Sequence, residues 1–377
     1  MKLTCVLAVL AVLSVPACLL SAPASYQLEK TTQVTNAGAK AQTTRSSGRC
    51  LCVDADGNAH MTWEDGRHFN AFEVYYTSTL GDSVLPEIRL TLTPAESSYP
   101  AIACDSADVY IVWEEVMGND SEIYCVHLRD REEVGRVRVT DTNLDSSCPV
   151  CAVGPDGAVH VAWHEGPFKQ TAIYYAKIVD DNVVATESVC TTDPEAFRAD
   201  IACGPEGRIL VVWLDGMEVK SRFRGSDGWG EEQLIGTNLS RPWRLSVASL
   251  GDGNWAAAWF HRGEEGEEVF INFSDGENWH DQTRINREWP GYYPNVAPLG
   301  REGAVVGWEE RVTGIDQHTV MVRCYDGEQW GDPLEIYRHR RNGRYVSVAA
   351  HGDLIHALYF SSRSGAKEIY YARLRKK

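Results

Sequence analysis

A large aromatic residue, Trp or Tyr, occurs at a nearly constant interval along the chain, each time at the end of a short apolar run. By subtraction, successive members are 46 to 51 residues apart. The seven positions are Trp63, Trp113, Trp163, Trp213, Trp259, Trp308 and Tyr359. A period in this range is typical of solenoids, arrays and propellers. One structural unit is therefore repeated seven times, and its content decides among these architectures.

Each repeat consists of strand-forming segments separated by turn residues. In the third repeat, 149–153 is followed by the turn 154–157, by a run that ends at Trp163, and by 172–177. Runs rich in Val, Ile and Tyr between Gly, Pro and Asp turns are typical of β-hairpins. A fourth run precedes the next repeat, as in 187–191. The pattern predicts an all-β fold: a seven-bladed β-propeller of four-stranded antiparallel blades.

The last repeat is one strand short, because the chain ends soon after 368–373. The segment 26–35 at the other end of the chain looks like a fourth strand. We expect this N-terminal strand to pair beside the last strand and close the ring, which removes the exposed sheet edges. A linear array of hairpins is the alternative, but it would leave its end repeats uncapped. We predict that residues 25–377 form a single propeller domain.

Residues 1–24 are predicted to be a signal peptide. Lys2 precedes an apolar stretch over 3–15, which is too short to span a membrane, and 22–24 fits a small-x-small cleavage pattern. A lipid anchor at Cys18 is the competing interpretation, because the residues before it resemble a lipoprotein box. No later segment is long and apolar enough to cross a bilayer. We expect a secreted or periplasmic protein, with a lipoprotein as the alternative.

The chain carries a formal net charge of −17 at pH 7. Nucleic-acid binding depends on Lys and Arg that neutralise phosphates, so we expect no nucleic-acid partner. The acidic composition is typical of a soluble exported protein, which we expect to be a monomer.

Nine cysteines remain after the two in the predicted signal peptide, an odd number that cannot all pair internally. Five of them fall in the first strands of their repeats: Cys50, Cys52, Cys104, Cys151 and Cys203. We expect buried structural thiols rather than a disulfide framework, because a fold of this size has ample core. No set of Cys and His residues has the spacing of a zinc site. We expect no metal site and no cofactor.

Three turns after third strands contain adjacent Asp and Gly residues followed by Trp: 226–229, 274–279 and 325–330. They resemble the Asp boxes of the sialidase superfamily, in which one residue separates the Asp from the Gly. The cadence of strands and turns resembles sialidase-like, BNR-repeat exported propellers over essentially the whole mature chain. The resemblance implies a site at the mouth of the central channel, on the face opposite these turns. The superfamily includes hydrolases, lyases and plain binding proteins.

Alignment of the repeats on their aromatic anchors predicts an uneven mouth. The position before each first strand holds Gly48, Tyr99, Cys148, Arg198, Arg244, Tyr293 and Arg344. Its predecessor holds Ser47, Ser98, Ser147, Phe197, Trp243, Tyr292 and Gly343. Arginines and aromatic residues are therefore concentrated after the third repeat.

Guanidinium groups bind a planar carboxylate through paired hydrogen bonds, and aromatic faces stack on the apolar side of a sugar. We therefore predict a carbohydrate ligand, acidic or neutral, at the channel mouth. The predicted ligand-binding residues are Arg198, Arg244, Arg344, Phe197, Trp243, Tyr292 and Tyr99. In the alternative interpretation, each Arg pairs with a loop carboxylate and the aromatic residues pack between blades.

Three other functions stay open. By resemblance to the sialidase family, a hydrolase would need an Arg triad, a Tyr nucleophile activated by a Glu, and an Asp acid/base. The candidate catalytic residues are Tyr345, Tyr293, Glu309, Glu310 and Asp65. A polysaccharide lyase would use an Arg to neutralise a uronate, with His164, His261 or a Tyr as base. A protein-interaction scaffold would have no small ligand at the mouth.

Two further repeated positions favour structural roles. Carboxylates occur two residues after five anchors, at Asp65, Glu115, Glu165, Asp215 and Glu310. We expect them to cap loops and to pair with arginines such as Arg67; in the alternative, some face the channel and raise one another's pKa. The histidines that share one position inside the second strand are His60, His160 and His356. Their repetition predicts packing or hydrogen bonding rather than catalysis.

Overall fold

The computed structural model describes residues 25–377 except for 37, 39, 45–47, 69–70, 119, 168, 191–194, 238–239, 241, 265, 287–288, 313–316 and 338–342. The predicted signal peptide, the predicted anchor at Cys18 and the aligned Ser47 therefore lie outside the described residues.

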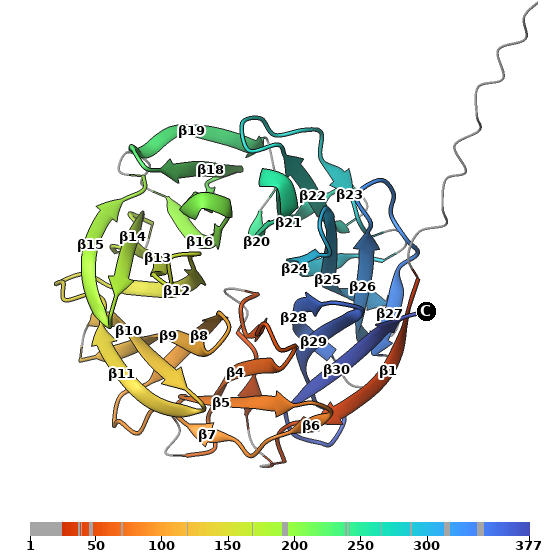
Figure 1. Ribbon diagram of the computed structural model, residues 1–377, viewed down its shortest axis with the longest axis horizontal. Helices are drawn as coiled ribbons and strands as arrows, with labels where there is room; N and C mark the ends of the chain where they lie inside the picture. The colour runs from red at the N-terminus through yellow and green to blue at the C-terminus, as the bar shows by residue number, and fades with distance from the viewer. Residues whose placement is uncertain are drawn as a thin grey trace, which may run out of the picture.

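The chain folds as the seven-bladed β-propeller that the repeat predicts (Figure 1). Each blade is an antiparallel sheet whose first strand lies near the axis and whose fourth strand lies at the rim (Figure 1). In blade 1 the first and fourth strands are each broken into two short pieces. Blade 1 contains β2 (Ala41–Gln42), β3 (Leu51–Val53), β4 (Ala59–Asp65), β5 (Glu73–Leu80), β6 (Ser83–Val84) and β7 (Ile88–Arg89).

Blades 2 to 4 are regular. They contain β8 (Ser97–Cys104), β9 (Asp108–Met117), β10 (Asp120–Arg129), β11 (Glu132–Arg138), β12 (Ser146–Val153), β13 (Val159–Glu165), β14 (Ala172–Val179), β15 (Asn182–Ser188), β16 (Ala196–Cys203), β17 (Ile209–Asp215), β18 (Glu218–Gly225) and β19 (Gly228–Gly236). Blades 5 to 7 contain β20 (Trp243–Ser249), β21 (Trp255–Gly263), β22 (Gly266–Ser274), β23 (Thr283–Arg284), β24 (Gly291–Leu299), β25 (Gly303–Val312), β26 (Gln317–Tyr325), β27 (Leu334–Tyr337), β28 (Gly343–His351), β29 (Leu354–Ser361) and β30 (Glu368–Lys376).

The N-terminal strand closes the ring, as the incomplete last repeat predicts. Strand β1 (Tyr26–Gln33) pairs antiparallel with β30 and becomes the fourth strand of blade 7 (Figure 1). The pairing continues past β1, where the Val34 amide donates to the Ile369 carbonyl at 2.8 Å. The Thr35 hydroxyl donates to the buried Glu368 carboxylate and accepts the Ile369 amide at 3.0 Å. The two ends of the chain are thus joined by backbone and side-chain bonds.

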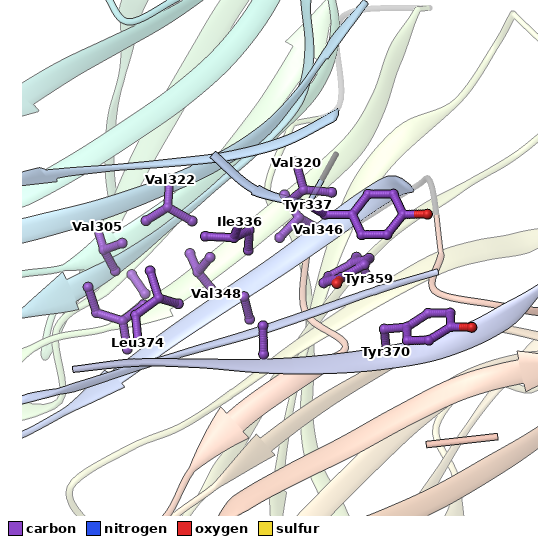
Figure 2. Packing of buried hydrophobic residues seen from close by; sticks show 14 of the residues in the cluster. Val305, Val320, Val322, Ile336, Tyr337, Val346, Val348, Tyr359, Tyr370 and Leu374 are labelled. Carbon is purple, nitrogen blue, oxygen red and sulfur yellow. The ribbon is translucent and has the colours of Figure 1, made fainter. Parts of the chain in front are cut away.

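The aromatic anchors lie in the hydrophobic core between neighbouring blades. All seven are fully or almost fully buried. Figure 2 shows the core between blades 6 and 7, where Tyr359 lies beside Tyr370 and Tyr337 and valines such as Val305 and Val322 pack further along the strands. The rings of Tyr359 and Tyr370 stack at 5.9 Å, as those of Trp163 and Tyr174 do at 6.0 Å. The anchor recurs because each blade needs one large side chain to fill the wedge against its neighbour.

The cysteines and the repeated histidines have structural roles. The nine cysteines that follow the predicted signal peptide are all free thiols, and burial raises the pKa of Cys151 to about 12. The imidazole Nδ1 of His160 forms a hydrogen bond of 2.7 Å with the Tyr175 hydroxyl. The same bond joins His60 to Tyr76 and His356 to Tyr371. The predicted hydrogen-bonding role of these histidines is confirmed.

Candidate functional site

The first strand of each blade from 2 to 7 bends at a residue with a positive φ angle, beside a shift in its pairing register. These residues are Tyr99, Cys148, Arg198, Arg244, Tyr293 and Tyr345, with φ between 37° and 54°. Left-handed backbone costs a non-glycine residue about 1 to 3 kcal/mol, and such residues cluster at functional sites. The six bulges lie on the face of the ring that carries the loops between second and third strands.

The structure corrects the sequence alignment in two respects. The aligned residues lie within the first strands rather than before them, and the bulge of blade 7 falls on Tyr345 rather than on Arg344. Arg344 instead takes the position that Tyr292 holds in blade 6. The reason is the length of the turn between the first and second strands. Two residues, 352–353, join β28 to β29, whereas three residues, 300–302, join β24 to β25. The shorter turn moves the register by one residue.

A pocket of about 530 Å³ opens between blades 3, 4 and 5. We call it the Arg198 pocket. Its walls include Cys148 and His164 from blade 3, Phe197 and Arg198 from blade 4, and Trp243 from blade 5. It brings together three of the predicted ligand-binding residues, because adjacent blades place equivalent first-strand positions side by side.

The Arg198 guanidinium lies over the indole of Trp243, with Cζ 4.0 Å from the ring centroid. Phe197 meets the same indole edge-on, with ring centroids 6.1 Å apart. Trp243 is 37% exposed, and among the described residues it is the aromatic member of the exposed large apolar side chains. A stacked guanidinium presents its N–H donors at the edge of an aromatic surface. This arrangement suits a ligand that has both a planar anionic group and an apolar face.

His164 forms the inner wall of the Arg198 pocket. Burial lowers the pKa of its imidazole to about 4, and the nearby charge of Arg198 acts in the same direction. The imidazole is therefore neutral at pH 7. Its Nδ1 is buried and has no hydrogen-bond partner in the described part of the chain. Asp145, Lys169 and Glu195 complete the rim with charges of both signs.

A repeated contact links the second strand of three blades to the bulge of the next blade. The residue directly after the anchor is a glutamate in blades 1, 2 and 6. Its carboxylate accepts a hydrogen bond from the backbone amide of the residue with a positive φ angle in the first strand of the next blade. The three bonds are Glu64 to Tyr99 at 2.9 Å, Glu114 to Cys148 at 3.0 Å and Glu309 to Tyr345 at 3.2 Å. We call this contact the carboxylate latch. Blades 3, 4 and 5 carry His164, Leu214 and Phe260 at the same position.

The other two predicted arginines do not line the Arg198 pocket. Arg244 is fully buried, and its Nη2 donates to the Val346 carbonyl at 3.5 Å. Burial lowers the pKa of Arg244 to about 10. Arg344 pairs with the buried Glu309 at 3.1 Å, and this partner raises the pKa of Arg344 against the opposing effect of burial. Arg198 is thus the predicted arginine that lines the Arg198 pocket, and Arg344 is paired with Glu309.

The predicted tyrosines belong to two other places on the same face. The Tyr292 hydroxyl donates to Glu267 at 2.8 Å, and burial raises the pKa of Tyr292 to about 12. Tyr293 packs edge-on against Tyr345 at 4.8 Å, and burial raises its pKa as well. Tyr99 and Tyr345 line a cavity of about 280 Å³ between blades 7, 1 and 2.

The carboxylates two residues after the anchors have structural partners. Asp65 is fully buried, accepts the Arg67 amide at 3.0 Å and pairs with the Arg67 guanidinium, so the expected loop pairing is confirmed there. Where the residue is a glutamate, its carboxylate also accepts a hydrogen bond from the indole nitrogen of the anchor tryptophan. These bonds join Trp113 to Glu115 at 3.1 Å, Trp163 to Glu165 at 3.1 Å and Trp308 to Glu310 at 3.0 Å. Sequence reasoning missed this bond, although the repeated Trp-x-Glu triplet could have indicated it.

A second feature, which the sequence pattern did not indicate, crosses the central channel. Arg49 of blade 1 pairs with the fully buried Asp200 of blade 4 and donates from Nη2 to the Val247 carbonyl of blade 5 at 2.8 Å. The Asp200 carboxylate also accepts the Val247 amide at 2.8 Å. Arg49 therefore spans the axis, and it lines an axial cavity of about 310 Å³ formed by first strands of all seven blades.

Two general properties bear on function. Across the residues that the structure describes, no group of three or more His, Cys, Asp or Glu side chains is arranged to hold a metal ion. The same residues include no helix of the length and apolarity needed to cross a membrane.

Comparison with known proteins shows which fold the chain shares with solved structures. No family model matches the chain, and no curated protein matches it. An ulvan lyase of polysaccharide lyase family 25, solved with -[GlcA(1-4)Rha3S]- bound, is similar with a TM-score of 0.62 and 9% identity over 91% of this chain and 95% of that one. A Dyadobacter fermentans protein of unknown function has a TM-score of 0.55 and 9% identity, over 93% of this chain and 99% of that one.

A sialidase is among the similar structures as well. The Hadza microbial sialidase has a TM-score of 0.50 and 11% identity, over 80% of this chain and 73% of that one. The chain therefore has a sialidase-like seven-bladed propeller fold, which it shares with polysaccharide lyases. At these identities the likeness extends to the fold alone.

Proposed function

We propose that the protein is a secreted, glycan-binding propeller that recognises an acidic sugar in the Arg198 pocket. The observation that carries the proposal is the stacking of Arg198 on the partly exposed indole of Trp243 inside a pocket of about 530 Å³. The indole offers a face for the apolar side of a sugar ring, and the guanidinium offers donors for a carboxylate. A sialidase and an ulvan lyase solved with -[GlcA(1-4)Rha3S]- bound share the fold, which supports a carbohydrate ligand.

The test measures binding of uronate-containing oligosaccharides by calorimetry. Substitution R198M removes the donors, and a lost hydrogen bond to a charged group corresponds to about 10- to 100-fold weaker binding. A matched control is R208M, because the Arg208 guanidinium stacks on Phe223 at the same 4.0 Å but lies in the turn before β17, at the other end of its blade. Equal binding by the wild type and R198M would overturn the assignment.

A polysaccharide lyase is the second candidate, and His164 favours it. A lyase needs a base to remove the C5 proton of a uronate, a cation to stabilise the resulting carboxylate-linked anion, and a proton for the departing C4 oxygen. His164 is neutral at pH 7, lines the pocket and is electrostatically coupled to Arg198. A neutral imidazole beside a guanidinium supplies the first two requirements.

The lyase activity is tested with uronate polysaccharides as substrates. The unsaturated product absorbs in the ultraviolet, so its formation by the wild type and its loss in H164N would support elimination. Binding without any product would leave the binding function and exclude the lyase for those substrates.

The hydrolase and the scaffold remain alternatives, but no observation favours either function over glycan binding at the Arg198 pocket. For the hydrolase, the Glu309 carboxylate accepts a hydrogen bond from the backbone amide of Tyr345 and forms an ion pair with Arg344. Asp65 is fully buried and forms an ion pair with Arg67. Release of a fluorophore from a sialoside would support the hydrolase.

A further inference from the structure

We propose that Cys52 and Cys104 are a thiol pair that forms a disulfide bond between blades 1 and 2 on oxidation. Both thiols are free in the structure. The inference goes beyond the proposed glycan binding, because the two cysteines line the axial cavity and not the Arg198 pocket. The bond would join the inner strands of two neighbouring blades.

The backbone brings these two first strands together just before the thiols. The Ile102 amide of β8 donates to the Arg49 carbonyl of blade 1 at 2.7 Å. Strands joined by such a bond lie about 4.8 Å apart, and a disulfide needs Cα atoms about 4.4 to 6.8 Å apart. Both strands then run in the same direction, because the blades are copies arranged around one axis. From this bond the chain reaches Cys52 three residues after Arg49 and Cys104 two residues after Ile102.

The two side chains meet at the interface between the blades. Both pack against the hydrophobic cluster between blades 1 and 2, which includes Tyr76 and Ile111. Both also line the axial cavity of about 310 Å³. Burial raises the pKa of Cys52 well above its ordinary value, and a side-chain hydrogen bond with Cys104 acts in the same direction. The thiols are therefore direct neighbours.

Other thiols near the axis are placed differently. Cys203 also lines the axial cavity, but blade 3 lies between it and Cys104 and carries Val153 at the equivalent position. Cys151 is fully buried, whereas Cys52 and Cys104 are partly exposed. An oxidant that enters the axial cavity would therefore meet Cys52 and Cys104 together.

The oxidant in this reaction is a small-molecule disulfide such as oxidised glutathione. One protein thiol loses its proton, and its sulfur attacks a sulfur of the oxidant, so that a mixed disulfide forms and one glutathione thiolate leaves. The second protein thiol loses its proton, attacks the protein sulfur of the mixed disulfide and releases the second glutathione. The two leaving thiolates take up the two protons, and two electrons pass from the protein to the oxidant. A thiolate is the reacting form, so a buried, protonated pair reacts slowly.

The disulfide would fasten a short inner strand. The first strand of blade 1 is broken into β2 and β3, and β3 has only three residues. By subtraction, the two cysteines are 52 residues apart. A cross-link over a loop of this length restricts the unfolded chain and so favours the folded one. We expect the oxidised protein to unfold at a higher temperature than the reduced protein.

The test incubates the folded, reduced protein with oxidised glutathione and maps its peptides by mass spectrometry without reduction. We expect a cross-linked pair of peptides that contain Cys52 and Cys104, with the loss of two hydrogens. Substitutions C52S and C104S should each stop the reaction at the mixed disulfide, so that the remaining thiol carries one glutathione. The matched control is C324S, which removes a partly exposed thiol of β26 in blade 6 and should leave the cross-link unchanged.

The map of the wild type decides the proposal even where a serine variant fails to fold, because it needs no substitution. Free thiols at Cys52 and Cys104 after the full incubation, or a cross-link from either one to Cys203, would overturn the assignment. Dithiothreitol should restore both thiols and the lower unfolding temperature of the reduced protein. Equal unfolding temperatures of the cross-linked and reduced proteins would contradict the stabilising role of the bond.

Discussion

The indole Nε1 of Trp163 donates a hydrogen bond of 3.1 Å to the Glu165 carboxylate, two residues further along the same strand. The two side chains lie on one face because side chains alternate along a strand. Where the glutamate is shortened to aspartate, as after Trp63 and Trp213, the buried indole nitrogen has no partner in the described residues. The length of the acidic side chain therefore decides whether the anchor of a blade is hydrogen-bonded.

Substitution E165D is expected to lower the free energy of unfolding by about 1 to 3 kcal/mol, because it leaves the Trp163 indole and the Ser146 hydroxyl without their common acceptor. Urea denaturation measures the change. The matched control is E132D on the exposed strand β11, which we expect to change stability by less than about 0.5 kcal/mol. Equal values for the two variants would show that the indole bond contributes nothing.

The bond between Arg49 and Asp200 is expected to hold the ring together across its axis. Substitution R49M leaves the fully buried Asp200 carboxylate without its cation, and breaking a buried pair from one side costs about 3 to 5 kcal/mol. Removal of the exposed Arg129, which pairs with Asp108 at 2.7 Å, should lower stability far less, because solvent screens an exposed ion pair. Chemical denaturation of R49M and R129M gives both values. A loss in R49M no larger than in R129M would contradict a role for the axial bond.

The fold was predictable because its signal is repeated. Seven anchors gave the number of blades, and the unpaired last repeat indicated which terminal segment closes the ring. Those inferences needed only the period and the strand alternation, both of which are properties of a sequence.

The site was predictable only in part. Phe197, Arg198 and Trp243 could be grouped in advance because neighbouring repeats place equivalent positions side by side. Arg344 was misaligned because the register of a bulge depends on the length of the turn between the first and second strands, which the anchors do not report. Arg49 was missed because it occurs once and acts across the axis, where no repeat predicts its partner.

The buried histidines predict a loss of stability on mild acidification. Burial lowers the pKa of His160 from 6.5 to about 4, and the pKa of His356 likewise. Between these values the unfolded chain binds more protons than the folded one, so the free energy of unfolding falls as the pH drops from about 6.5 to 4 and levels off below. Glu114 acts with the opposite sign, because burial raises its pKa from 4.5 to about 7.

Substitution H160Q isolates one histidine, since an amide can still form a hydrogen bond with the Tyr175 hydroxyl. We expect the slope of unfolding free energy against pH to decrease by up to about 1.4 kcal/mol per pH unit between pH 4 and 6.5. Urea denaturation at several pH values gives the slope. An identical slope in the wild type and H160Q would mean that His160 titrates alike in the folded and unfolded chains.

Ring closure by β1 predicts that the terminal strand can be removed and returned. A chain without residues 25–35 exposes the edge of β30, where strand pairing and the Thr35 contacts to Glu368 and Ile369 are lost. Unpaired strand edges promote association, so we expect oligomers by light scattering and a lower unfolding temperature. A synthetic peptide of residues 25–35 should restore the association state of the full chain by adding a strand to that edge, whereas a scrambled peptide of the same composition should not. A truncated chain with the same association state and stability as the full chain would contradict closure by this strand.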